Sequence, residues 1–144
     1  MKSKQSTPSQ AIKRIMVDMS ATLIHHGHIR LLEAASAYGK VIVALTTDEE
    51  VLAHKAYTPE LDFSSRAEIL RAIRFVDEIV PAPWLIESSF LDLHRIDLLV
   101  HGNDNTNPIS KERLLILPRT KGISSSILRG RMLKALSDNY LKKE

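Results

Sequence analysis

The chain has 144 residues, 44% of them hydrophobic, a length that suits one domain with an ordinary core. It contains no cysteine, which excludes disulfides, no apolar run near the roughly 18 residues of a membrane span, and no N-terminal stretch typical of a signal peptide. The formal charge of +3 comes without a dense run of Lys or Arg, so anionic small molecules suit it and nucleic acid is not required. We expect a soluble, cytoplasmic protein that binds neither a membrane nor nucleic acid.

Residues 1–12 are rich in Lys, Ser, Gln and Pro, which predicts a disordered tail ahead of a single domain over residues 13–144. Beyond the tail, short apolar runs typical of strands alternate with helical spacing. In chain order we expect a strand at 14–19, a helix at 29–38 ended by Gly39, a strand at 41–45, a helix begun by Thr47 and a loop at 59–63. There follow a helix from Ser64, a strand at 76–80 stopped by Pro81 and Pro83, a helix near 87–95, strands at 98–100 and 114–117, and a final helix over 128–140.

This alternation predicts a Rossmann-like α/β fold, a doubly wound parallel sheet of five strands with helices on both faces. In such a sheet, ligands bind beyond the carboxyl ends of the strands, where the strand order reverses. Polar clusters follow four of the five predicted strands, and all of them therefore fall on one rim: 25–28, 46–48, 101–104 and 119–120.

The cluster His25-His26-Gly27-His28 opens a helix directly after the first strand. Two imidazoles three positions apart share one helix face, Gly27 lets a ligand approach the backbone, and a helix N-terminus favours an anion. This pattern is suited to stabilising a phosphoryl group during transfer. A surface histidine cluster or part of a structural metal site is the alternative, and the missing cysteines and acidic neighbours weaken the metal interpretation.

A second motif, Arg119-Thr120-Lys121-Gly122-Ile123-Ser124-Ser125-Ser126, stands before the last helix. Ser124 is a good N-cap, the serines bring hydroxyls and free backbone N–H groups to a helix start, and Arg119 supplies a planar charge for phosphate. Serines before a helix are usually only caps, but on the same rim as the histidines they indicate a triphosphate cradle. Three further cations, Lys55, Arg66 and Arg74, would by themselves be solvated surface residues, the two arginines sharing one helical face.

Together the two motifs resemble the HxGH and RTxGIS[ST][ST] signatures of the cytidylyltransferase family, and the resemblance covers roughly residues 14–130. It extends to both the glycerol-3-phosphate branch and the branch that activates phosphonates such as 2-aminoethylphosphonate. The resemblance implies CTP as substrate, a small phosphorylated or phosphonylated acceptor, a CDP-linked product and pyrophosphate. Mg²⁺ would bind through the nucleotide phosphates without a dedicated set of protein ligands, and family members of this size imply a homodimer.

The resemblance also assigns roles by position. His25 and His28 would stabilise charge at the α-phosphoryl group, and Lys55 would neutralise acceptor and α-phosphate oxygens. Arg66 and Arg74, together with Lys55, would bind the anionic group of the acceptor. The positions expected to bind the nucleotide are Ser20, Ala21, Gly27, Gly102, Asp104, Arg119, Thr120, Ser124, Ser125 and Ser126.

Two segments depart from the family pattern. The GTFD segment stands here as Met19-Ser20-Ala21-Thr22, and GDDW as Gly102-Asn103-Asp104-Asn105. Both lie where the base and the acceptor would be recognised. Two alternatives therefore stay open beside a cytidylyltransferase: an adenylyltransferase of the same HxGH superfamily, and a domain that binds a nucleotide without turnover.

Overall fold

The structure is a computed structural model that describes residues 11–143. Residues 1–10 of the predicted disordered tail lie outside the described residues. Five strands form one sheet in which every pair of neighbours is parallel, in the order β3-β2-β1-β4-β5. These strands are β1 (Arg14–Met19), β2 (Lys40–Thr46), β3 (Glu78–Ala82), β4 (Leu98–His101) and β5 (Leu114–Ile116). The predicted doubly wound sheet is confirmed, and the strand order reverses between β1 and β4.

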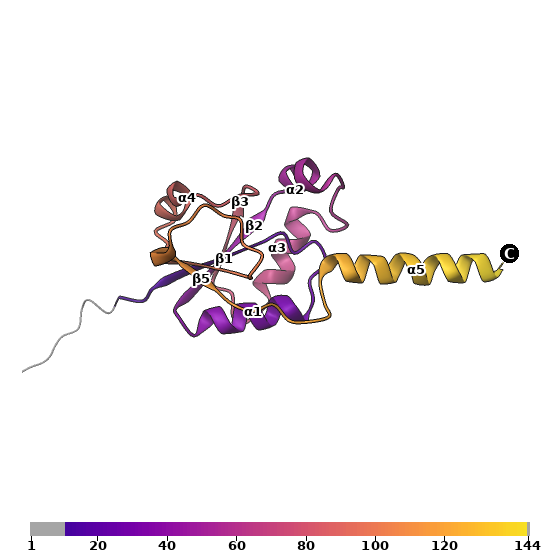
Figure 1. The fold of residues 1–144 in the computed structure, drawn as a ribbon, viewed down its shortest axis with the longest axis horizontal. Helices are drawn as coiled ribbons and strands as arrows, with labels where there is room; N and C mark the ends of the chain where they lie inside the picture. The colour runs from indigo at the N-terminus through magenta and orange to yellow at the C-terminus, as the bar shows by residue number, and fades with distance from the viewer. Residues whose placement is uncertain (1–10, 144) are drawn as a thin grey trace, which may run out of the picture.

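Helices connect the strands and cover both faces of the sheet (Figure 1). They are α1 (His26–Ser36), α2 (Asp48–Lys55), α3 (Phe63–Arg71), α4 (Ser88–Leu93) and α5 (Ser125–Lys143), with a single 3₁₀ turn, η1 (Lys111–Arg113), ahead of β5. Because neighbouring residues of a strand point to opposite faces, Ile15 and Val17 pack in the core under α1 and α3, whereas Met16 packs in the core under α4. All three side chains are inaccessible to solvent.

The predicted start of α1 and the predicted stop of β3 differ from the structure, the first for a local reason and the second because of the sheet topology. Helix α1 begins at His26, ahead of the predicted position 29, because His25 caps it. Strand β3 does not stop at Pro81, which lies inside it opposite Leu45 of β2. Proline is tolerated there because β3 is an edge strand, so the missing N–H removes no bond from the interior of the sheet.

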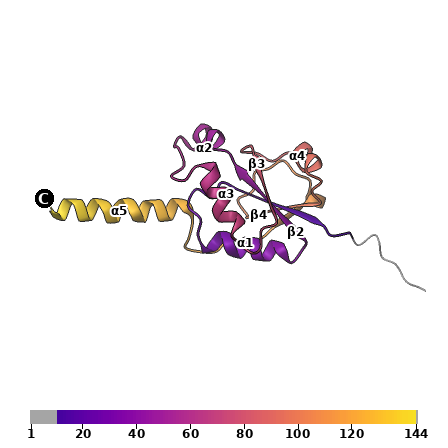
Figure 2. The same ribbon diagram turned by 180° about the vertical axis from the view of Figure 1, so that it is seen from behind.

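The final helix α5 is confirmed, but it projects away from the sheet rather than packing on it (Figures 1 and 2). Its 19 residues include apolar side chains that remain well exposed, namely Met132 at 46%, Leu133 at 64% and Leu136 at 54%. Among the helices of residues 11–143, none is long and apolar enough to span a membrane.

Candidate active site

A pocket of about 470 Å³ opens at the carboxyl ends of the strands. Its wall is built from the segments that follow all five strands, so the fold brings together residues from both ends of the chain. The predicted site residues that line it are Ser20, Ala21, His25, His28, Lys55, Gly102, Asp104, Arg119, Ser124, Ser125 and Ser126. The histidine motif and the serine-lined start of α5 therefore share one pocket.

The two histidines of the first motif hold each other in place through the backbone. His25 is the N-cap of α1, and its Nδ1 accepts a hydrogen bond of 3.0 Å from the backbone N–H of Gly27. In return, Nδ1 of His28 accepts a bond of 3.1 Å from the backbone N–H of His25. The ring centroids lie 4.0 Å apart. This reciprocal cap satisfies two backbone donors that a helix start leaves free.

The reciprocal cap also fixes the tautomer of both rings. Since each Nδ1 accepts a bond, the proton of each neutral imidazole is on Nε2. Burial, with the charges of His25 and Arg119 adding to it, lowers the pKa of His28 to about 3. Burial, together with His26 and Arg119, lowers the pKa of His25 as well. At neutral pH both rings are uncharged Nε2–H donors, able to hydrogen-bond phosphate oxygens.

Acid should destabilise the folded chain through His28. Between its usual pKa of 6.5 and its folded pKa of about 3, the unfolded chain binds a proton that the folded chain does not. Stability should therefore fall as the pH drops through this window, by at most about 5 kcal/mol over the whole of it. Urea unfolding between pH 7 and pH 4 measures the effect. The variant His28→Asn, which does not titrate there, should have a flatter pH dependence, and a slope equal to that of the unmodified protein would contradict the assignment.

Gly27 is required by the cap rather than by a ligand. A Cβ at this position would lie 2.8 Å from Cε1 of His25 and 3.3 Å from Cγ2 of Ile123. Gly27 and Thr120 do not line the main pocket but a smaller cavity of about 150 Å³ on the other side of the same histidines. The Gly27 backbone thus lies against the His25 ring, and the approach of a ligand to it stays a prediction.

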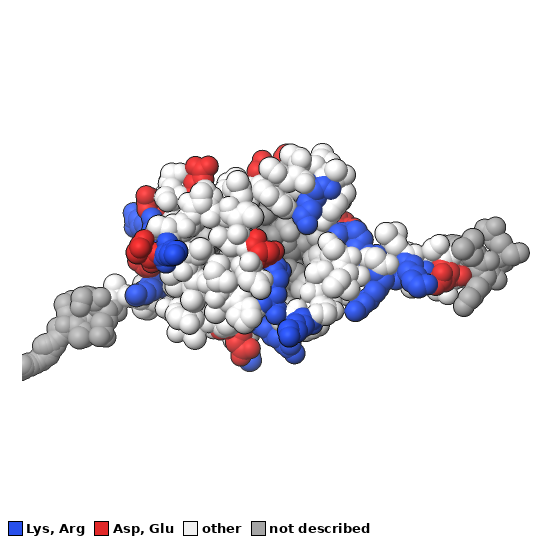
Figure 3. All heavy atoms as spheres, in the orientation of Figure 1, with Lys and Arg blue, Asp and Glu red and all other residues white. Residues whose placement is uncertain are grey.

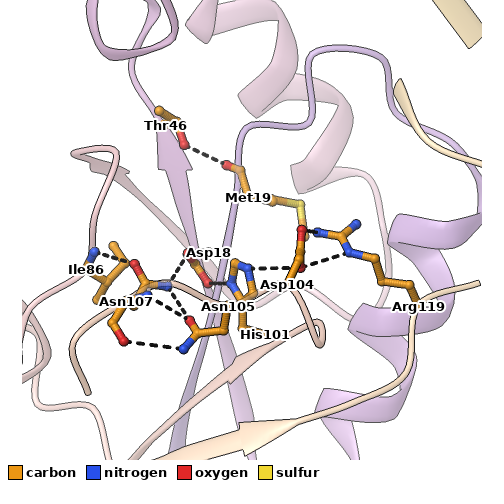
Figure 4. A network of polar contacts seen from close by, with 9 residues as sticks. All are labelled: Asp18, Met19, Thr46, Ile86, His101, Asp104, Asn105, Asn107 and Arg119. Carbon is orange, nitrogen blue, oxygen red and sulfur yellow. Dashed lines mark hydrogen bonds and ion pairs between the residues drawn. The ribbon is translucent and has the colours of Figure 1, made fainter. Parts of the chain in front are cut away.

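A line of polar contacts crosses the pocket from β1 to the segment after β5 (Figure 4). His101 donates from Nδ1 to Oδ1 of Asp18 at 2.6 Å, and its Nε2 lies 3.5 Å from Oδ1 of Asp104. Asp104 in turn accepts two bonds from the Arg119 guanidinium, at 3.0 and 2.8 Å. Burial opposes the charged form of His101, but Asp18 and Asp104 outweigh it and raise the pKa of His101. His101 therefore retains a proton to higher pH than an ordinary histidine.

The backbone of Gly102 lies against the side chain of Arg119. A Cβ at Gly102 would lie 2.8 Å from Nε and 3.0 Å from Cγ of Arg119, and 3.1 Å from Oδ1 of Asp104. The Gly102→Ala variant should therefore push Arg119 out of the pocket.

If Arg119 binds a nucleotide phosphate, as the resemblance implies, Gly102→Ala should weaken CTP binding about tenfold, because one charge-assisted bond is lost or distorted. Isothermal titration with CTP measures this change. Gly130→Ala is the matched control, since a Cβ at Gly130 meets nothing within 4 Å. Equal CTP affinities for the two variants would contradict the role given to Gly102.

The start of α5 is tied to the loop that follows β1. Ser124 is its N-cap, as predicted, because its Oγ accepts a bond of 3.0 Å from the backbone N–H of Ile127. The hydroxyl of Ser125 donates to the carbonyl of Leu23 at 2.8 Å and accepts from the N–H of Leu23 at 3.3 Å. The serine motif thus faces the pocket while it is fastened to the loop that leads into His25.

Lys55 ends α2 on the wall of the pocket, with its Nζ 5.8 Å from the ring centroid of Trp84. The other two predicted cations lie elsewhere. Arg66 is completely buried in α3 and donates to the carbonyls of Leu61, Ser20 and Thr46 and to the carboxylate of Asp48. The expectation that Arg66 contacts the acceptor is wrong for this structure, because its guanidinium braces the surrounding loops instead.

Arg74 does not share the helical face that its spacing from Arg66 suggested. Helix α3 ends at Arg71, and Arg74 lies exposed in the turn before β3, its guanidinium 5.1 Å from the Phe75 ring. That turn precedes the amino end of a parallel strand, so it is on the opposite edge of the sheet from the pocket. The predicted contact of Arg74 with the acceptor is therefore not supported.

The residues to which the sequence reasoning assigned no role but which line the pocket include Asp18, Trp84 and Asn107. Asn107 is only 7% exposed, and it donates to Asp18 at 3.0 Å while accepting from the N–H of Ile86 at 2.7 Å. The sequence held a signal for Asp18, because a charged residue inside an apolar strand such as β1 needs a buried partner. Asn107 had no comparable signal.

Lys and Arg side chains gather over α1 and the beginning of α5, beside acidic side chains that are more scattered (Figure 3). Within the pocket the basic groups are Lys55, Arg119 and His101, against the carboxylates of Asp18 and Asp104. Basic groups and uncharged imidazole donors that line one pocket favour a ligand with several phosphate oxygens.

A protein-family model described as "Cytidylyltransferase-like" matches residues 20–131. Among curated proteins, the chain is 36% identical to glycerol-3-phosphate cytidylyltransferase of Bacillus subtilis, over 80% of this chain and 93% of that protein. It is 35% identical to ethanolamine-phosphate cytidylyltransferase of Mus musculus, over 94% of this chain but 36% of that protein. The chain thus spans about a third of the length of the mouse relative.

A further curated relative is choline-phosphate cytidylyltransferase A of Homo sapiens, with 31% identity over 90% of this chain and 39% of that protein. Among solved structures, the lipopolysaccharide core biosynthesis protein from Thermoplasma volcanium superimposes with a TM-score of 0.59 and 17% identity, covering 87% of this chain and 89% of that one. This last similarity concerns the fold alone.

Proposed function

Because the chain belongs to the cytidylyltransferase-like family, we propose that it transfers CMP from CTP to a small acceptor that carries a phosphate or a phosphonate, with release of pyrophosphate. The observation that supports this most is the convergence of His25, His28, Lys55, Arg119 and the serines of α5 on one pocket. Imidazole donors, two cations and a helix N-terminus are the groups that a triphosphate in transfer requires.

In the proposed reaction, an oxygen of the acceptor phosphate attacks the α-phosphorus of CTP in line. The bond between the α-phosphorus and the oxygen that bridges to the β-phosphate breaks, and its electron pair leaves with pyrophosphate. The Nε2–H groups of His25 and His28 would donate to oxygens around the α-phosphorus, where negative charge gathers. Lys55 would bring the two anionic reactants together, and Arg119 with the serine hydroxyls would hold the remaining phosphates. Catalysis then consists of positioning and charge stabilisation.

We propose that Mg²⁺ binds to the phosphates of the nucleotide and has no ligand set of its own on the protein. Within the described residues, no group of three or more His, Cys, Asp or Glu side chains is placed to hold a metal ion. Of the two carboxylates in the pocket, Asp104 is held by the Arg119 guanidinium, and Asp18 is hydrogen-bonded to His101 and Asn107 with one bond to each oxygen. A Mg²⁺ ion would therefore be held by the phosphates and by water, which is a usual state of this ion in nucleotide sites.

For the acceptor, we propose a molecule with an amino group at the end opposite its phosphate or phosphonate. Asp18 brings a carboxylate to the pocket, and each of its oxygens accepts only one of the hydrogen bonds described. The bonds through Asn107 and Ile86 link this carboxylate to the segment that carries Trp84, whose ring also lines the pocket. The carboxylate of Asp18 attracts a cation more strongly than it attracts a polyol, and the Trp84 ring, which stacks on His54, forms a neighbouring part of the pocket lining. Ethanolamine phosphate and 2-aminoethylphosphonate have that chemistry, and glycerol 3-phosphate does not.

The test is pyrophosphate release from CTP or ATP with Mg²⁺, measured with glycerol 3-phosphate, ethanolamine phosphate, choline phosphate and 2-aminoethylphosphonate. Turnover with CTP and an amine-bearing acceptor is the expected result. Turnover with ATP alone would favour the adenylyltransferase alternative. Binding of CTP by calorimetry without turnover of any acceptor would favour a nucleotide-binding domain.

We also propose, from the family resemblance, a homodimer that works in the cytoplasm. The half-exposed apolar side chains of α5 are available for contact with a second copy of the chain. Light scattering after gel filtration should give twice the monomer mass of 16.2 kDa, and a monomer at micromolar concentration would contradict the dimer.

A further inference from the structure

Arg129, in the second turn of α5, contacts two other parts of the chain, the loop after β1 and the connection between α2 and α3. Its Nε and Nη2 donate to the two carboxylate oxygens of Glu60 at 2.6 and 2.7 Å. Nη2 also donates to Oγ1 of Thr22 at 3.2 Å, and the guanidinium lies 4.4 Å from the ring centroid of Tyr57. The hydroxyls of Thr22 and Tyr57 are 3.3 Å apart, which closes the group. We call these four residues the Arg129 clamp.

Each member of the Arg129 clamp is close in sequence to a residue of the candidate site. Thr22 follows Ala21 in the loop that leads to His25, Tyr57 is two residues after Lys55, and Arg129 is three residues after Ser126. The Arg129 clamp therefore joins the three segments that carry the histidines, the lysine and the serines. It does so on the outside of the pocket, because none of its four residues lines it.

The connection between α2 and α3 depends on this contact. Helix α2 ends at Lys55 with Ala56 in the left-handed region, at φ 64°, and α3 begins at Phe63. The side-chain hydrogen bonds that the structure describes for residues 56–60 go to Thr22 and Arg129. Without them the segment after Lys55 has no described side-chain hydrogen bond, and the packing of the buried Pro59 remains.

The charges of the pair support a strong contact. The guanidinium and the carboxylate meet through two parallel bonds, the geometry in which Arg–carboxylate pairs are strongest. The Arg129 side chain is 20% exposed and the Glu60 side chain 44%, so water screens the pair in part and the geometry of the two bonds carries the contact. The hydrogen bond with Arg129 lowers the pKa of Glu60, and Glu60 raises that of Arg129.

We propose that Arg129 is a positioning residue that holds Lys55 in the pocket by clamping the segment that follows it to α5. This inference rests on the proposed function of Lys55 and adds a residue outside the pocket to the machinery. Arg129 does not touch the reactants in this arrangement, and it acts through the orientation of the lysine. Turnover should therefore suffer more than CTP affinity when Arg129 is removed.

The test compares Arg129→Ala in two backgrounds. In the otherwise unmodified chain we expect kcat to fall at least about fivefold with CTP affinity within about twofold, as for a positioning group. In the Lys55→Ala background the same substitution should have little further effect, because the group that it positions is gone. Equal losses in both backgrounds would overturn the proposal and leave a structural role only.

Two further variants keep the test independent of folding. Exchanging the partners in Arg129→Glu with Glu60→Arg should restore part of the turnover that each single change removes. Lys134→Ala is the matched control, because it removes a surface ion pair of the same helix, with Asp138. Thermal melts of all variants identify any that do not fold.

A readout without turnover separates this inference from the proposed function. The chain has one tryptophan, Trp84, which lies near the Lys55 ammonium. Acrylamide should quench its fluorescence more in Arg129→Ala than in Lys134→Ala if the segment after Lys55 is released. Equal quenching in the two variants would overturn the clamp, whether or not any acceptor is turned over. Stronger quenching in Arg129→Ala together with no turnover of any acceptor would support the clamp and contradict only the proposed function.

Discussion

Replacing His28 with alanine should lower turnover about 10²–10³-fold, the cost of removing one preorganised donor from developing charge. CTP affinity should change far less, because Arg119 and the serines of α5 would still hold the phosphates. The measurement is pyrophosphate release under saturating CTP, with CTP affinity followed by calorimetry. His26→Ala is the matched control, since His26 is exposed next to the motif and does not line the pocket.

The geometry of the reciprocal cap allows the two nitrogens of His28 to be tested separately. In His28→Asn the side-chain oxygen takes the place of Nδ1, so the cap to the backbone N–H of His25 is retained and the Nε2 donor is lost. In His28→Gln the amide N–H takes the place of Nε2, so the donor is retained and the cap is weakened. We expect the asparagine variant to be stable and nearly inactive, and the glutamine variant to be less stable but more active.

The contrary pattern would be informative. If His28→Asn keeps its turnover, the ring serves only as a cap, and the proposed donor role of Nε2 is wrong. If both variants lose turnover and CTP binding together, His28 holds the nucleotide rather than stabilising the transfer step. The melting temperature of each variant shows whether a loss of turnover reflects a loss of folded protein.

Replacing Lys55 with alanine should lower kcat/KM for the acceptor about 10–100-fold, because the ammonium offsets repulsion between two anionic reactants in a partly enclosed pocket. The effect on CTP affinity should be smaller, since Arg119 and the helix start remain. Initial rates at varied acceptor concentration measure the change. Lys55→Arg keeps the charge but spreads it over a larger planar group, so partial activity is expected.

Lys111→Ala provides the comparison for Lys55. Lys111 is exposed in η1, directly before the amino end of β5 and therefore at the opposite edge of the sheet. Its removal makes the same change in net charge without touching the pocket. A loss below about tenfold for Lys55→Ala, or an equal loss for Lys111→Ala, would show that Lys55 is an ordinary surface lysine there.

The sequence predicted the sheet and its functional rim because both depend on local patterns. Continuous apolar runs such as 41–45 are typical of strands covered on both faces, and parallel strands bring their carboxyl ends to one edge. The N-caps Thr47 and Ser124 were also predictable, since the cap bond is made within three residues. These features need no information about distant parts of the chain.

The errors concern residues whose surroundings come from distant parts of the chain. Arg66 is buried because the carbonyls of Ser20 and Thr46 meet it from two other loops, and a helical pattern alone assigns an arginine to the surface. Pro81 is accommodated because β3 lies at the edge of the sheet, which its own sequence does not reveal. The contact of Asn107 with Asp18 joins residues 89 positions apart.

The reciprocal cap of His25 and His28 has a consequence for how such a chain changes over time. Because the backbone N–H groups of His25 and Gly27 hold the rings of His28 and His25, the orientation of both imidazoles is determined within four consecutive residues. If Asp18 selects the acceptor as proposed, substitutions around it should alter acceptor choice and leave the orientation of His25 and His28 unchanged. In such a chain the residues that determine reactivity and those that determine selectivity can change independently, so mutations near Asp18 alone would be enough to change the substrate.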